Sequence, residues 1–127
     1  MEHLNLLVGW TSMAAGAISG AAIGLFFHRP DWLGGYDSLP RRMLRLGHIA
    51  FFGLGIVNVL FALSAAAMAL SPSWVRFAGV AFALAVPAMP ACCFLTAWRP
   101  RFRLLFPIPV AAVLGGLGGL LGGALWR

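Results

Sequence analysis

The sequence predicts an all-α polytopic membrane protein, a bundle of four transmembrane helices with short loops and both termini on the non-cytoplasmic side. The first reason is composition: 61% of the residues are hydrophobic and only 9% are charged, whereas about a quarter of an average soluble domain is charged. The second is length, because 127 residues accommodate four spans of the ~20–25 residues that cross a bilayer. We therefore expect residues 1–127 to form a single transmembrane domain.

The first predicted span covers residues 4–27. Its small residues recur at every fourth position, at Ser12, Gly16, Gly20 and Gly24. Helices in lipid associate where small side chains let two backbones approach closely, so this face is predicted to pack against another helix. The apolar stretch is too long for the core of a signal peptide and lacks a basic region before it, so we expect it to be retained as a true span.

The second span is predicted over residues 43–70, after a polar loop of residues 29–42 rich in glycine and proline. Asp31 and Asp37 of this loop are expected to pair with neighbouring arginines. The span is longer than a hydrocarbon core of ~30 Å requires, so it must tilt or protrude into the interface.

The third span, residues 74–98, contains Pro87 and Pro90. Each proline frees a carbonyl about one turn upstream, so the second half of this helix is predicted to be kinked or locally unwound. The fourth span, residues 104–126, is rich in glycines spaced for close helix packing. The glycines predicted to pack are Gly115, Gly119 and Gly123.

Most basic residues flank two of the connections. Seven of the nine arginines follow the first and third spans. They are Arg29, Arg41, Arg42, Arg45, Arg99, Arg101 and Arg103. By the positive-inside rule these connections lie in the cytoplasm and both termini lie outside. Arginines beside apolar spans serve as topology signals and lipid-phosphate contacts, so we expect the lipid bilayer as partner and no nucleic acid.

The Arg-, Ala- and Gly-rich composition indicates a GC-rich bacterial genome and hence a multi-pass protein of the bacterial cytoplasmic (inner) membrane.

His48 is the first candidate for a binding site. It lies about one turn inside the second span, and Gly55 falls on nearly the same helix face seven residues later. A small residue two turns from a histidine leaves a flat surface that suits a haem or a quinone ring. The competing interpretation is a histidine that is hydrogen-bonded to a carbonyl or a lipid phosphate.

Met89, Cys92 and Cys93 lie in the third span at about the depth of His48. Imidazole and sulfur ligands suit copper(I) or haem iron, so His48 and Cys93 are candidate metal ligands. The alternative is that these residues are ordinary apolar filler. Asn58 is predicted to hydrogen-bond another helix, with the carbonyl freed near Pro87 as a candidate partner.

These residues favour one function without completing its site. No carboxylate lies within a span, which argues against a transporter that couples ions through a membrane acid, and the chain is not expected to be an enzyme on its own. The leading hypothesis is a small subunit of an electron-transfer or respiratory assembly that borders a haem, copper or quinone site. The alternatives are an oligomeric anion channel or carrier, and a scaffold without chemistry. The glycine-rich faces predict a homo-oligomer or a place in a larger membrane complex.

Overall fold

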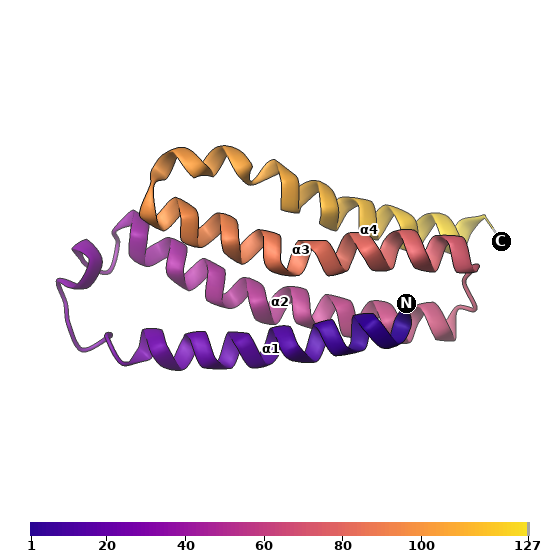
Figure 1. Ribbon diagram of the computed structural model, residues 1–127, viewed down its shortest axis with the longest axis horizontal. Coiled ribbons are helices and arrows are strands. Elements are labelled where there is room, and N and C mark those ends of the chain that lie inside the picture. Colours follow the sequence, from indigo (N-terminus) through magenta and orange to yellow (C-terminus); the bar gives the residue numbers. More distant parts are fainter. Residues whose placement is uncertain (127) are drawn as a thin grey trace.

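The computed structural model describes residues 1–126 and is all-helical. Its elements in chain order are α1 (Glu2–Gly24), the 3-10 turn η1 (Trp32–Gly34), α2 (Leu39–Ala67), α3 (Pro72–Trp98), the 3-10 helix η2 (Pro100–Leu105) and α4 (Pro107–Leu125). Four segments are long and apolar enough to cross a membrane. The helices run alternately up and down, side by side in chain order, with the N- and C-terminal ends of the chain at the same end (Figure 1). The predicted all-α class with four apolar helices is confirmed.

α2 begins four residues earlier than predicted, because its first turn is capped. The Oγ of Ser38 accepts a hydrogen bond from the backbone N–H of Arg41 at 3.4 Å, and Pro40 occupies the first turn, where it costs no helical bond. At the other end Ala69 adopts a left-handed φ of 48°, and the N–H of Leu70 donates to the carbonyl of Ala65 at 3.2 Å. This C-terminal motif closes the helix and turns Leu70 into the core.

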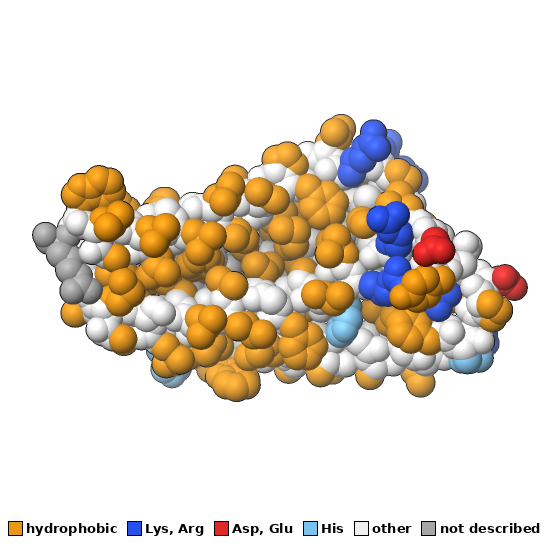
Figure 2. All heavy atoms as spheres, turned by 180° about the vertical axis from the view of Figure 1, so that it is seen from behind, with side chains coloured by type: hydrophobic (Ala, Val, Ile, Leu, Met, Phe, Trp, Pro, Cys, Tyr) orange, Lys and Arg blue, Asp and Glu red, His pale blue; other side chains and the backbone are white. Residues whose placement is uncertain are grey.

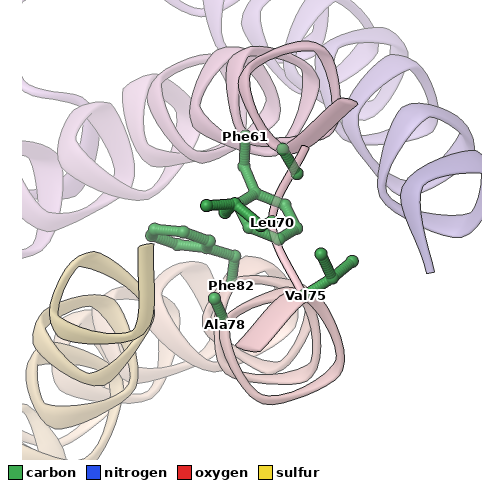
Figure 3. Packing of buried hydrophobic residues seen from close by; sticks show 6 residues of the cluster. Phe61, Leu70, Val75, Ala78 and Phe82 are labelled. Atoms are coloured by element: carbon green, nitrogen blue, oxygen red, sulfur yellow. The ribbon is translucent and has the colours of Figure 1, made fainter. Parts of the chain in front are cut away.

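The helices pack as an inner group of three with a fourth on its flank. α2 lies between α1 and α3, α1 also touches α3, and α4 packs on α3. The larger core cluster joins α2 to α3 through Phe61, Val75, Ala78 and Phe82 (Figure 3). The Phe82 ring also reaches α4, where a Cβ on Gly116 would lie only 2.6 Å from a ring carbon. A larger side chain at Gly116 would therefore push α4 away from α3.

The small residues of α1 form a groove that α2 fills. A Cβ on Gly16 would meet the Phe52 ring at 2.6 Å, and Gly20 lies directly beneath the imidazole of His48. The hydroxyl of Ser12 donates to the carbonyl of Phe51 at 2.6 Å. Gly24 has nothing within 4 Å of its Cβ position, because it is the last residue of α1 and lies beyond this contact.

In α4 two of the three predicted glycines pack against α3 and the third does not. Gly119 and Gly123 lie against α3, where Cβ atoms would meet Phe77 and Trp74 at 2.7 and 2.8 Å. Gly115 has nothing within 4 Å, because its neighbour Gly116 takes the position that faces α3.

α3 remains helical from Pro72 to Trp98 and changes direction near its middle (Figure 1). The two prolines thus accompany a bend, and the alternative of local unwinding is not found.

Candidate functional site

Two buried asparagines tie the three inner helices together. Asn5 of α1 and Asn58 of α2 are both 0% exposed. The Nδ2 of Asn5 donates to the Oδ1 of Asn58 at 2.8 Å and to the carbonyl of Gly79 in α3 at 2.9 Å. An amide inside an apolar bundle must find partners within the protein, so this pair favours one arrangement of the three helices. We refer to Asn5 and Asn58 as the asparagine clasp.

Asn58 also reaches α3 directly. Its Nδ2 donates to the carbonyl of Phe82 at 3.2 Å and, within α2, to that of Leu54 at 2.9 Å. Phe82 directly precedes Ala83, whose carbonyl loses its usual helical partner at Pro87, so Asn58 bonds the neighbouring carbonyl and not the freed one. Sequence reasoning missed Asn5, although a carboxamide within an apolar span is itself a signal of a buried contact.

His48 lies half-buried in the contact between α2 and α1. Its Nδ1 is 2.8 Å from the carbonyl oxygen of Gly16. Because a carbonyl can only accept, Nδ1 carries the hydrogen. The Oγ of Ser19 lies 3.4 Å from the same nitrogen, and the ring of Phe52 stands edge-on with its centroid 5.9 Å away. The imidazole is therefore held in one orientation, and within residues 1–126 its Nε2 has no hydrogen-bond partner.

Gly55 does not extend a flat surface beside His48. Its Cβ position is 2.8 Å from the carbonyl oxygen of Gly9 and 2.8 Å from the Cγ of Met13. The surface that the sequence left open for a planar ring is covered by α1 of the same chain. His48 and Gly55 thus both serve the contact between α1 and α2.

The sulfur-bearing residues lie on a different side of α2 from His48. Cys93 is 0% exposed, and its Cβ is 3.1 Å from the Cβ position of Gly47. Gly47 directly precedes His48, and successive helical residues are rotated by ~100°, so His48 faces α1 while Gly47 faces α3. Both thiols are free and buried, and Met89 packs beside the core cluster of Leu54. No group of three or more His, Cys, Asp or Glu side chains that could hold a metal occurs in the described part of the chain.

The end of the molecule away from the termini is rich in arginine. Figure 2 shows arginine side chains gathered there, over the loop after α1 and the segment around η2. Arg29, Arg42, Arg99, Arg101 and Arg103 are exposed and Arg45 is half-buried, with its guanidinium 4.0 Å from the centroid of the Tyr36 ring. This end presents cationic groups at the level where four helical segments leave the apolar region.

Arg41 differs from the other arginines because it is only 3% exposed. Its guanidinium carbon lies 5.5, 5.6 and 5.5 Å from the ring centroids of Phe27, Trp32 and Tyr36, and its Nη1 donates to the carbonyl of Pro30 at 3.3 Å. Such aromatic faces and carbonyl oxygens attract a cation without neutralising it. Arg41 was predicted as a rim residue, and its burial follows from the loop folding back over α2.

The aspartates of this loop do not form the predicted ion pairs. Neither the Asp31 nor the Asp37 carboxylate forms an ion pair or a hydrogen bond among residues 1–126, and both residues are exposed. The carbonyls and rings of the loop hold the Arg41 guanidinium instead. Seven arginines outnumber these two aspartates, so the arginine-rich end carries a net positive charge.

Comparisons with protein-family models, with curated proteins and with solved structures found no match to this chain. The fold and the polar residues themselves define its class. It is a helical protein with four membrane-spanning-type helices, an asparagine clasp that joins α1, α2 and α3, a single oriented histidine between α1 and α2, and an arginine-rich end.

Proposed function

We propose that the protein is a small integral membrane subunit of an electron-transfer or respiratory assembly, in which His48 contacts a redox ring bound between this chain and a partner. The observation that carries this proposal is the geometry of the imidazole. Nδ1 donates to the Gly16 carbonyl at 2.8 Å, which leaves the lone pair of Nε2 free in the neutral ring. Such an Nε2 can accept a hydrogen bond from a quinol or ligate haem iron, and a backbone carbonyl behind the other nitrogen is the usual support.

A quinol fits this geometry better than a metal bound by this chain alone. A copper(I) site would need sulfur ligands beside the imidazole, and Cys93 lies against Gly47 on another side of α2. A quinol needs an acceptor for its hydroxyl and an apolar wall. The Nε2 of His48 supplies the acceptor, and Phe52 stands beside the His48 ring. Because this chain offers a single polar contact, the rest of the site must come from another subunit or a second copy. That requirement supports a role as a subunit.

We further propose that the arginine-rich end faces the cytoplasm of a bacterium, so that both termini lie outside the cytoplasmic membrane. A membrane-impermeant maleimide tests this in intact cells, in a chain whose Cys92 and Cys93 are replaced by alanine. A cysteine at the exposed Trp126 should react directly. A cysteine at Asp37 in the loop after α1 should react only after the membrane is permeabilised. The reverse pattern would refute the orientation.

The proposed role of His48 predicts that a bound redox ring is lost when the imidazole is removed. Protein purified in a mild detergent should carry quinone or show a haem Soret band. His48→Ala should lower the quinone content about five-fold, as expected for a hydrogen bond of ~1 kcal/mol, or abolish the Soret band. The matched control is His28→Ala, which removes an exposed histidine of the loop after α1. It should leave the quinone content and the Soret band unchanged.

A colourless, quinone-free preparation that does not take up haem or quinone on reconstitution would overturn the redox proposal. The asparagine clasp favours a second candidate in that case, a scaffold without chemistry. Its amides join α1, α2 and α3 of this chain and so leave no polar group there for a cofactor. A chain of this kind would act only by holding partners in place. Co-purifying subunits without any cofactor would support this alternative.

A further inference from the structure

An apolar groove lies on the surface between α2 and the start of α4. It encloses about 410 Å³ and is lined without polar groups, and volumes of ~300–1,000 Å³ are usual for ligand sites. Figure 1 shows η2 and the beginning of α4 standing away from α3 at the end remote from the termini. The residues that line the groove are Leu46, Ile49, Ala50, Gly53, Leu54, Met89 and Phe106.

The groove runs lengthwise along α2 and begins beneath the arginine-rich end. Its lining on α2 extends from Leu46 to Leu54, a length of ~12 Å at helical rise. Gly53 has nothing within 4 Å of its Cβ position, so this side of α2 leaves room that no side chain of the protein fills. The shape suits an unbranched apolar chain lying along the helix.

Two free cations flank the mouth of the groove. Arg42 precedes Leu46 by four residues, so it lies on the same side of α2 one turn closer to the end. Arg103 precedes Phe106 by three residues, and residues three apart in a 3-10 segment lie above one another. Both arginines are exposed, and neither guanidinium has a side-chain partner in the part of the chain that the structure describes. The two walls of the groove thus each end in an unpaired positive charge.

We propose that this groove binds an anionic phospholipid, with one acyl chain along Leu46 to Leu54 and the phosphate between Arg42 and Arg103. Charge complementarity selects this occupant. A helix of a partner protein would fill an apolar groove equally well, but it would leave two guanidinium groups at the mouth without anions. In a phospholipid the acyl chain leads to the phosphate, as the apolar groove leads to the two arginines. Guanidinium binds phosphate with two parallel hydrogen bonds.

The test compares phosphatidylglycerol with phosphatidylcholine of the same acyl chains, bound to the full-length chain and counted by native mass spectrometry. The wild-type protein should retain phosphatidylglycerol preferentially. Arg42→Gln and Arg103→Gln should each lower that retention about five-fold, since a basic residue near an anionic membrane surface contributes ~1 kcal/mol. Gly53→Leu should also lower it, because the new side chain would occupy the groove.

Matched controls separate the groove from general effects. Arg29→Gln removes an exposed arginine of the same end that does not line the groove, and Gly118→Leu adds a leucine at an α4 position with nothing within 4 Å. Neither control should change retention. Equal retention of the two lipids by the wild type, or equal losses in the controls, would overturn the proposal.

Discussion

Replacing Gly55 with leucine is expected to lower the free energy of unfolding by about 3 kcal/mol, at the upper end of the range for overpacked sites. Gly55 and Gly9 mark the closest approach of α2 and α1. A Cβ at Gly55 would lie 2.8 Å from the carbonyl oxygen of Gly9, and a Cβ at Gly9 would lie 2.7 Å from that of Gly55. Because these neighbours are backbone atoms, no side-chain rotation can relieve the overlap, and the two helices must separate.

Separation at this point would also strain the polar contacts on either side of it. The clasp between Asn5 and Asn58 lies toward the termini, and the hydrogen bond from Ser12 to Phe51 lies toward the arginine-rich end. The measurement is denaturant unfolding in detergent micelles, followed by circular dichroism. The matched control is Gly53→Leu, two residues earlier in α2 with nothing within 4 Å, which should be neutral or stabilising because leucine favours helix. Equal destabilisation by both variants would refute the close-approach explanation.

The second large effect is expected for Asn58→Ala, which should destabilise the protein by about 2 kcal/mol. The change removes the acceptor for Asn5 Nδ2 at 2.8 Å and the donor to the Phe82 carbonyl at 3.2 Å. Interhelical hydrogen bonds in membrane proteins contribute ~0.6 kcal/mol on average and up to ~1.7 kcal/mol. Two average bonds would contribute about 1.2 kcal/mol, and the loss should exceed this value because Asn5 stays buried without its partner on α2.

A double-mutant cycle with Asn5→Ala tests whether the two asparagines act as a pair. The double variant should be more stable than the sum of the single losses predicts, with a coupling of about 1 kcal/mol. Thr11→Ala serves as the control because the Thr11 hydroxyl donates only to carbonyls of its own helix. Strict additivity of the two asparagine substitutions would contradict a direct bond between them.

Much of the fold follows from composition and spacing. Apolar runs of the right length predict four helices, because in a bilayer every backbone group must be bonded within its own segment. The period of four in Ser12, Gly16 and Gly20 predicts a packing face, and α2 occupies it. The starts of the helices were predicted less well, since α2 extends back to its Ser38 cap into a stretch that reads as loop.

The rotation of each helix about its axis could not be predicted in the same way. In a soluble protein a polar face turns to water and sets that rotation, but lipid is as apolar as the side chains it contacts, so an apolar helix offers no such preference. The order of the glycines in α4 illustrates this, because Gly115 and Gly116 are equivalent in the sequence and only Gly116 meets the Phe82 ring. Arg41 is similar, since its aromatic surroundings come from a loop whose path no local pattern specifies.

The sequence by itself determined that this chain forms four apolar helices, that arginines gather at one end, and that His48 and Asn58 are the polar residues to examine within α2. Only the tertiary structure decided which neighbours they meet. A rotation of ~100° between consecutive helical residues turns His48 toward the Gly16 carbonyl and Gly47 toward Cys93, which separates two residues that share a depth along the helices. The buried amides and the backbone contact of Gly9 with Gly55 select that rotation, because they lose their bonds and their close fit in any other.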